Sequence, residues 1–342
     1  MEKMKGCFSR RSFLAGGVSL GAFAAVGAEA TPPDSKIKGV TEGNPAIMNR
    51  RTYVAACPPV KESIPRTPGQ QRVMVIGAHP DDADIQCGCT TARLVAKGAR
   101  VKFVAVCNGC VGHHRMNRKE TAAVRRQETL NAAKVWGLDS YDIYGYEDAG
   151  VPYDIPTREV IARKIQEFEP DIIITHRDCD YHVDHRTVGM HVKDCGYMLG
   201  CPHWIEGSKA LRRRPLILLM RDDFTVPRVM RPDILVDADP FIDKWCDALD
   251  CQVSQFYEWL AWDEGIEDEV KALGNRAENI TARNDYLKRH WALKKIRDAA
   301  RFADEWGKQY PGRAVPKMLE AYEISEYGRP PIEDDFELLM GE

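Results

Sequence analysis

A short acidic turn directly after a buried strand constrains this chain more than any other feature. Residues 72–76 form a continuous apolar, β-branched run of strand length. After them come Gly77-Ala78-His79-Pro80-Asp81-Asp82, and then a stretch of helical composition that stops at Gly98, a residue suited to a helix C-terminus. This strand-to-helix turn would crowd two carboxylates and an imidazole together. A divalent metal ion is the simplest group that offsets their crowding.

Strands and helices alternate downstream of this turn. Strands are expected at 101–107, 141–144 and 172–175, and helices at 83–97, about 119–136, and from 157 to just before Pro170. This repetition predicts an α/β fold, Rossmann-like, with a mostly parallel sheet and helices on both faces. A helical C-terminal elaboration follows, including one amphipathic surface helix over about residues 282–308.

The N-terminus has the pattern of a bacterial export signal. Ser9-Arg10-Arg11-Ser12-Phe13-Leu14 is a twin-arginine pattern, a weakly apolar stretch follows, and Ala28-Glu29-Ala30 offers a cleavage site. We expect residues 1–30 to be a twin-arginine signal peptide and the twin-arginine export machinery to be a partner. The protein would then be periplasmic or extracellular. The apolar stretch is too short and glycine-rich to leave a stable membrane span.

Composition divides the remaining chain and excludes some partners. Residues 31–70 are rich in proline and predict a linker or wrapping segment, followed by one domain over 71–330 and a C-terminal tail over 331–342. The formal net charge of −3 argues against nucleic acid as a partner. Eleven cysteines in an exported chain are compatible with some disulfides, whose pairing the sequence does not define.

A second polar cluster follows the strand at 172–175. It reads His176-Arg177-Asp178-Cys179-Asp180-Tyr181-His182-Val183-Asp184-His185. Ligands of open α/β sheets bind at the carboxyl ends of the strands, so this cluster and the first turn are expected to meet there. Two such clusters at the ends of one sheet predict a functional site.

The residue types indicate a hydrolytic metal site. His79, Asp82 and His185 would form a two-histidine, one-carboxylate set with an open position, which is typical of catalytic zinc. Zn²⁺ is expected, with Fe²⁺ or another divalent metal as the alternative. A metal-bound water has its pKa lowered towards neutrality.

Three further residues are assigned catalytic roles. Asp81 cannot point the same way as Asp82 and is predicted to be the general base for the water. His182 is predicted to stabilise the oxyanion and to protonate the leaving group. Asp184 is expected to orient His182 and to favour its charged form.

These motifs resemble the LmbE/PIG-L family of zinc-dependent N-deacetylases. The resemblance covers about residues 70–330 and is carried by A-H-P-D-D at 78–82 and H-x-D-H at 182–185, with weaker similarities at 170–176, 244–255 and 320–329. The resemblance implies the same metal ligands, with Asp81 as base and His182 as acid. It also implies an acylated amino sugar or glycan as the substrate. The chain departs from the family pattern at Ala83, at Gly88-Cys89 and at Gln252.

Other functions compete with this interpretation. A non-catalytic carbohydrate-binding relative would not need Asp81 and His182. A non-haem Fe(II) oxygenase shares the ligand types but usually has an all-β barrel. A dinucleotide-binding domain is disfavoured because the first turn lacks G-x-G-x-x-G and presents acids where amides would be needed.

Several residues outside the two motifs are weaker candidates. Arg115 and Arg118 could hold a polar substrate. Cys107 and Cys110, followed by His113 and His114, could form a second metal site or a redox pair, although a lone C-x-x-C is a weak signal. Three tryptophans are considered for stacking on a sugar ring, with core packing as the alternative: Trp204, Trp259 and Trp262.

Overall fold

The computed structural model describes residues 71–341. The expected signal peptide and proline-rich segment, residues 1–30 and 31–70, lie outside the described residues and stay predictions. None of the described helices combines the length and the apolarity needed to cross a bilayer.

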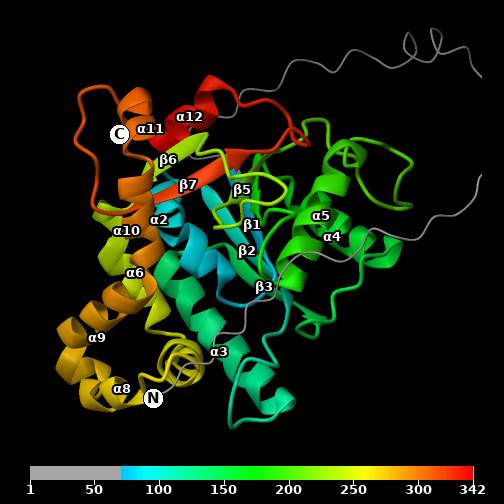
Figure 1. Ribbon diagram of the computed structural model, residues 1–342. Coiled ribbons are helices and arrows are strands. Elements are labelled where there is room, and N and C mark those ends of the chain that lie inside the picture. The colour runs from blue at the N-terminus through cyan, green and yellow to red at the C-terminus, as the bar shows by residue number, and fades with distance from the viewer. Residues whose placement is uncertain (1–70, 342) are drawn as a thin grey trace, which may run out of the picture. The chain divides into compact units, whose positions relative to one another are not determined.

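A seven-stranded sheet forms the centre of this domain (Figure 1). Its strands are β1 (Arg72–Gly77), β2 (Arg100–Cys107), β3 (Ser140–Tyr146), β4 (Ile172–Thr175), β5 (Leu216–Met220), β6 (Ile234–Asp237) and β7 (Leu319–Ile324). Their order is β3-β2-β1-β4-β5-β7-β6. The first five run parallel, while β7 is antiparallel to both β5 and β6. The predicted α/β fold with a mostly parallel sheet is therefore confirmed.

Helices cover both faces of the sheet. The helices of the parallel part are α2 (Asp82–Ala96), α3 (Arg118–Trp136), α4 (Ile155–Phe168) and α5 (Val183–Met198). The later ones are a 3₁₀ turn (Asp239–Phe241), α6 (Ile242–Leu249), the π-helix η2 (Ser254–Trp259), α7 (Leu260–Asp263), α8 (Glu267–Leu273), α9 (Arg276–Trp291), α10 (Leu293–Arg301), α11 (Ala303–Gln309) and α12 (Glu333–Met340).

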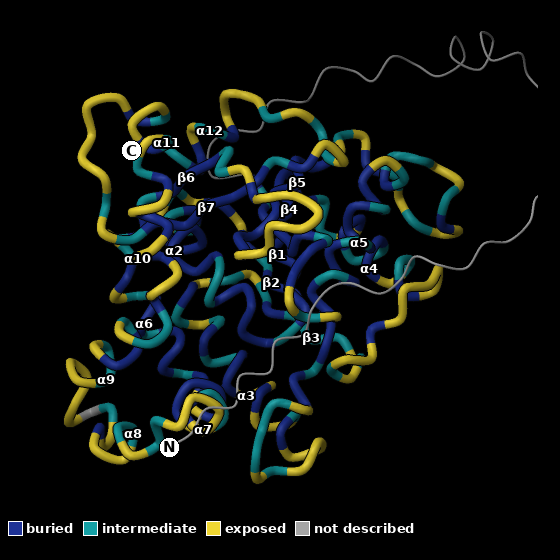
Figure 2. The backbone as a smooth tube through the Cα atoms, in the orientation of Figure 1, coloured by how far each residue is buried: buried dark blue, intermediate teal, exposed yellow. Residues whose placement is uncertain are grey.

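The alternation of side chains along the strands divides the core into two layers. Val73 and Val75 of β1 face a cluster that includes residues of α2, α3 and α6, whereas Met74 and Ile76 face a cluster formed with α4 and α5. Residues one apart on a strand point to opposite faces, so a strand buried on both sides must be apolar throughout. Figure 2 shows these central strands as buried along most of their length.

Helix ends follow the chemistry of their capping residues. Asn117 accepts hydrogen bonds from Lys119 N and Glu120 N in a capping box that begins α3, and Gly137 ends that helix with φ of +78°. The expected start of α4 moves slightly, because Asp154 caps it by accepting from Thr157 N.

Two expectations about the C-terminal part are wrong. The single helix expected over 282–308 is divided among α9, α10 and α11, and its apolar Tyr286 is fully buried. The segment expected to be a tail contains α12, which buries Leu338 and Leu339 in the main core. Apolar side chains in these segments pack on the domain, which a loose tail would not allow.

A buried ion pair holds α2 against the C-terminal elaboration. Lys295 Nζ of α10 lies 2.6 Å from Glu320 Oε1 of β7 and also donates to the Ile85 carbonyl of α2. Glu320 in turn accepts from the backbone N–H groups of Cys89 and Thr90. Lys295 and Glu320 therefore bond to backbone groups of α2, beginning about one turn after the acidic residues of the first motif.

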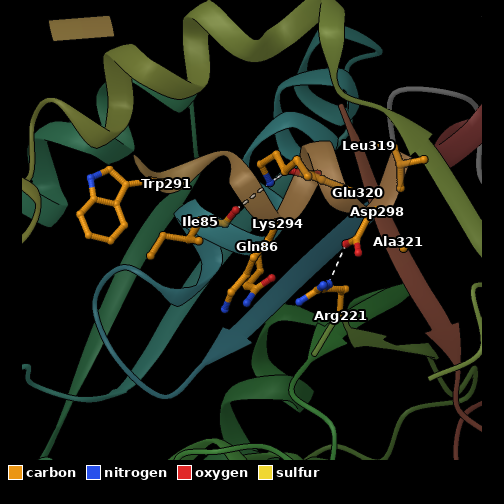
Figure 3. A pocket seen from close by; sticks show the side chains of 10 residues that line it. Ile85, Gln86, Arg221, Trp291, Lys294, Asp298, Leu319, Glu320 and Ala321 are labelled. Atoms are coloured by element: carbon orange, nitrogen blue, oxygen red, sulfur yellow. Dashed lines mark hydrogen bonds and ion pairs between the residues drawn. The ribbon is translucent and has the colours of Figure 1, made fainter. Parts of the chain in front are cut away.

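A hollow in the surface lies beside this pair (Figure 3). Figure 3 shows the polar ends of Gln86 and Arg221 directed towards the same space, and Arg221 Nε donates to Asp298 Oδ2 at 2.7 Å. The space is lined by α2, the end of β5, α10 and the start of β7.

Replacing Lys295 with Met is expected to lower the free energy of unfolding by about 3–5 kcal/mol, because the Glu320 carboxylate would stay buried without its ammonium partner. Chemical denaturation measures the change. The control is Lys164→Met, which breaks the exposed Lys164–Glu167 pair and should cost no more than about 1 kcal/mol. Equal stability of Lys295→Met and the unaltered chain would contradict the role given to the buried pair.

Candidate metal centre

The two predicted clusters meet where the strand order reverses. The chain runs from β1 outwards to β2 and β3 and then returns to β4 on the other side of β1. The carboxyl ends of β1 and β4 therefore form a topological switch point, the usual ligand site of such sheets. The turn over 78–81 leaves β1 here, and the loop over 176–182 leaves β4 beside it.

Side-chain donor atoms of three residues converge at this point. His79 Nδ1 lies 3.3 Å from His185 Nε2 and 3.5 Å from Asp82 Oδ2, while His185 Nε2 lies 3.2 Å from Asp82 Oδ1. Two ligands bound tetrahedrally at zinc distances are separated by about 3.3 Å. The three residues therefore fit a single metal ion.

Hydrogen bonds on the far side of each histidine fix its tautomer. His79 Nε2 lies 3.0 Å from Asp184 Oδ2, and His185 Nδ1 lies 2.9 Å from Asp180 Oδ1. A carboxylate can only accept, so each of these ring nitrogens carries a proton. His79 Nδ1 and His185 Nε2 then carry lone pairs, and these two nitrogens lie close to each other and to Asp82. Carboxylate–histidine pairs of this kind are typical of metal sites.

The electrostatics of the cluster also favour a cation. Burial alone would lower the pKa of His79, but hydrogen bonds with Asp184 and Asp82 raise that pKa well above its usual value. Burial likewise opposes the charged form of His185, whose pKa is nevertheless raised to about 9 by Asp82 and Asp180. The same charges that would retain a proton would stabilise a bound metal ion.

The backbone of the first turn orients Asp82. Its Oδ2 accepts from Ala78 N at 2.8 Å and from His79 N at 2.7 Å, which leaves Oδ1 towards His185. Burial opposes ionisation of Asp82, but the neighbouring His185 and His176 hold its pKa well below the usual value. Asp82 is therefore a carboxylate fixed in position.

Asp81 has a side-chain partner of its own outside the three donors. It is buried, and its Oδ2 accepts a hydrogen bond from the side-chain amide of Gln255 in η2. Burial and the adjacent Asp82 raise the pKa of Asp81, against the opposing effects of Arg125 and His79. A buried carboxylate with a raised pKa, one residue from the candidate ligands, suits proton transfer.

Asp184 has a different main partner from the one expected. Its Oδ2 accepts from His79 Nε2 and from Ala149 N at 2.6 Å, whereas His182 Nδ1 lies 3.7 Å away. Burial and the neighbouring His79 and His185 lower the pKa of His182, so its charged form is not favoured. Asp184 therefore orients the ring of His79; its charge does favour the protonated form of His182, as expected, but burial and the two neighbouring histidines outweigh it.

His182 is held as the N-cap of α5. Its Nδ1 accepts from Asp184 N at 3.2 Å, which leaves the proton on Nε2. The ring lies edge-on to His79 with centroids 4.5 Å apart, and 31% of the side chain is exposed. Nε2–H is therefore available to a ligand beside the three donors.

The structure adds residues that the sequence analysis did not assign. His176 stacks on His185 with ring centroids 4.0 Å apart, and its Nε2 lies 3.1 Å from Asp82 Oδ2. The position of His176 directly after a buried strand could have indicated from the sequence that it belongs to the site. Asp180 and Gln255 were also missed, because their roles depend on partners that only the folded chain brings near.

The weaker candidates have different outcomes. Arg118 is exposed and pairs with Glu147, and Arg115 is also exposed. Cys107 and Cys110 are free thiols, as are the other seven cysteines of the described chain. Cys107 does lie near His79 and Asp148, but Asp148 accepts from Gly109 N and Val111 N and so holds the loop.

Comparisons with known proteins agree with the resemblance seen in the motifs. The sequence model of the PIG-L family, described as GlcNAc-PI de-N-acetylase, matches residues 74–195. The chain is 23% identical over 205 residues to diacetylchitobiose deacetylase of Thermococcus kodakarensis, covering 56% of this chain and 74% of that protein. It is 27% identical to a probable N-acetyl-α-D-glucosaminyl L-malate deacetylase of Bacillus cereus, covering 36% of this chain and 60% of that protein.

Solved structures share the fold at low sequence identity. N,N'-diacetylchitobiose deacetylase from Pyrococcus horikoshii superimposes with a TM-score of 0.58 at 20% identity, covering 77% of this chain and 88% of that one. GalB of Pseudomonas putida, a 4-carboxy-2-hydroxymuconate hydratase, gives 0.56 at 16% identity, covering 77% and 98%. The matched region contains both motifs and the paired strands β1 and β4. Residues 74–195 therefore match the PIG-L (LmbE) family.

Proposed function

We propose that this protein is a metal-dependent hydrolase that removes an N-acyl group, in the first instance acetyl, from an amino sugar or glycoconjugate. The observation that carries this proposal is the convergence of His79, Asp82 and His185 beside Asp81 and the available Nε2–H of His182. The names of the relatives support the substrate class, since one is a diacetylchitobiose deacetylase and another a probable N-acetyl-α-D-glucosaminyl L-malate deacetylase.

The three donors would hold the metal, for which we propose Zn²⁺. A metal bound there would lower the pKa of a water molecule and polarise the acyl carbonyl. Asp184 and Asp180 maintain the ring orientations that this requires.

Asp81 and His182 would divide the proton transfers. Asp81 accepts a proton from the attacking water, and Gln255 keeps its carboxylate in place. His182 donates its Nε2–H to the acyl oxygen as negative charge develops there and delivers the proton that the leaving amine needs. The new C–O bond forms as negative charge develops on the acyl oxygen, and the C–N bond then breaks as the amine takes its proton. The proton taken from water balances the one given to the amine.

The alternatives account for fewer of these contacts. A non-catalytic sugar-binding protein has no use for a buried carboxylate with a raised pKa at the ligand site. A non-haem iron oxygenase would use the two histidines and one carboxylate, but not the Asp81–Gln255 and His182 arrangement.

Acetate release across a panel of N-acetylated sugars tests the proposed reaction. The full-length protein is expected to release acetate from at least one member after chelation and addition of Zn²⁺. Asp81→Asn should retain bound zinc and lose turnover, because the amide cannot accept the proton. Loss of zinc from Asp81→Asn would instead make Asp81 a ligand, and no acetate from a zinc-loaded protein would contradict the deacetylase assignment.

Replacing His182 with Asn should lower kcat by about 10²- to 10⁴-fold. Asn retains the N-cap of α5 but lacks the imidazole proton, so the folded structure should keep its melting temperature. His182→Ala is the matched variant, which should lose both the proton donor and about 1 kcal/mol of helix capping. A kcat for His182→Asn equal to that of the unaltered enzyme would remove His182 from the mechanism.

Asp184→Asn should weaken zinc binding by about 10- to 100-fold, because His79 would lose its charged acceptor. Competition with a chelator measures the affinity. Asp194→Asn, on the same helix but paired with Arg158, is the control and should leave the affinity unchanged. Unchanged zinc affinity with a lowered kcat for Asp184→Asn would show that Asp184 serves His182 instead.

A further inference from the structure

A third strand end lies beside the candidate metal centre. β2 pairs with β1 on one side and with β3 on the other, and all three strands run parallel. β2 ends at Cys107, whose N–H donates to the Ala78 carbonyl of the turn after β1 at 2.7 Å. The loop after β3 carries Asp148, which accepts from Gly109 N, two residues beyond Cys107. Side chains that follow three neighbouring strands therefore meet next to His79.

Cys107, Asp148 and His79 form a group with the donor types of a metal site. One sulfur, one carboxylate oxygen and one imidazole nitrogen of these residues all lie within 4.8 Å of one another. Asp184 belongs to the same group, because its Oδ2 lies 3.0 Å from His79 Nε2 and its charge acts on the Cys107 thiol. Donors around a tetrahedral ion are about 3.3–3.6 Å apart, so small shifts of these side chains suffice to bind one.

An ion can reach this group from solvent. The Cys107 thiol is buried, but Asp148 is partly exposed and its neighbours Glu147 and Ala149 are exposed. Both oxygens of Asp148 accept backbone N–H groups of the loop after β2, and each retains a second lone pair. Asp148 can therefore hold this loop and bind an ion at the same time.

The ring of His79 can serve either of two ions. In the metal centre described above, which we call the first centre, Nδ1 faces Asp82 and His185 while the proton on Nε2 goes to Asp184. A neutral imidazole has one N–H and one lone pair, so moving the proton to Nδ1 frees Nε2. The Nδ1 proton then has acceptors, since His185 Nε2 lies 3.3 Å and Asp82 Oδ2 3.5 Å away. The fold therefore provides partners for both tautomers, and in the second one Nε2 and Asp184 are available beside Cys107.

The sulfur decides which ions suit this group. Soft thiolate ligands select soft or borderline ions, whereas Mg²⁺, Ca²⁺ and Mn²⁺ prefer oxygen ligands. The first centre offers two imidazoles and a carboxylate, without sulfur. A soft ion such as Cd²⁺ is therefore expected to prefer the group that contains Cys107.

We propose that Cys107, Asp148 and the Nε2 side of His79 form a second site, for a soft divalent cation. Asp184 completes the coordination, and occupation of this second site withdraws His79 from the first centre. Binding releases the Cys107 thiol proton to solvent and moves the His79 proton from Nε2 to Nδ1, so one proton leaves for each ion bound. The second site is independent of the reaction proposed above, and only its inhibitory effect rests on the proposed function.

Cadmium binding to the chelated full-length protein tests the second site. Cd²⁺ held by a thiolate has a charge-transfer band in the ultraviolet that nitrogen and oxygen ligands do not produce. The unaltered protein is expected to show this band at one equivalent of Cd²⁺, and Cys107→Ser should lose it. Cys110→Ser is the matched control and should keep the band, since Cys110 is not one of the three grouped residues. An unchanged band in Cys107→Ser would overturn the site.

Asp148→Asn gives a second measurement that leaves every thiol in place. The band should remain at saturation, while the affinity for Cd²⁺ should fall by about 10- to 100-fold because a charged ligand is lost. Competition with a chelator measures this affinity. An unaltered affinity for Cd²⁺ would contradict the place given to Asp148.

Two histidine variants separate the second site from the first centre. His185→Ala removes a donor of the first centre alone, so it should lose zinc and keep the cadmium band. His79→Ala should lose zinc and also bind Cd²⁺ at least about tenfold more weakly, because His79 belongs to both sites. Disappearance of the band from His185→Ala would tie the band to the first centre and overturn the proposal.

Inhibition is measured on the zinc-loaded enzyme. Cd²⁺ should lower acetate release, and Cys107→Ser should need about tenfold more Cd²⁺ for half-inhibition, each protein being compared with its own uninhibited rate. Equal sensitivity of the two proteins would overturn the withdrawal of His79. If neither protein releases acetate, the proposed reaction fails, and the cadmium band still decides whether the second site exists.

Discussion

The parallel pairing of β1 with β4 is the interaction on which the site depends. Its register, from Val73 opposite Ile172 to Ile76 opposite Thr175, ends both strands at one level. The turn after β1 then supplies His79 and Asp82, and the segment after β4 supplies His185. A slip of two residues would move one strand by about 7 Å, twice the separation of the donor atoms. Side chains buried on both faces of the two strands keep the register in place.

Local chemistry and sheet topology explain why much of this could be predicted from the sequence. Continuous apolar runs identified β1 and β4 as central strands, and a cap such as Gly137 located a helix end. Parallel strands present their carboxyl ends at one edge, so polar clusters after two such strands were expected to meet. The C-terminal helices could not be divided correctly, because neither glycine nor proline marks the breaks at Ala292 and Phe302.

Contacts between distant segments were beyond what the sequence could indicate. Asp184 follows His182 closely in sequence, which suggested that the two interact, yet its carboxylate bonds to His79, 105 residues earlier. Asp180 and Gln255 likewise act through side chains from other parts of the fold. Sequence proximity predicts a hydrogen bond only when the local backbone directs both groups the same way. At the start of α5 the local backbone directs the N–H of Asp184, and not the Asp184 carboxylate, to the His182 ring.

The fold alone does not determine the reaction, since a hydratase and a deacetylase superimpose on this chain about equally well. The assignment therefore depends on side chains. The family resemblance leads one to expect a glutamate where this chain has Ala83, but a carboxylate recurs at Asp84. Asp84 is fully buried, accepts from Trp136 Nε1 and Tyr141 Oη, and has its pKa raised to about 7 by burial. A buried carboxyl group close to Asp81 is thus supplied by a different residue. Asp81 contributes to this raised pKa, so the two buried carboxyl groups interact and a charge on one disfavours a charge on the other.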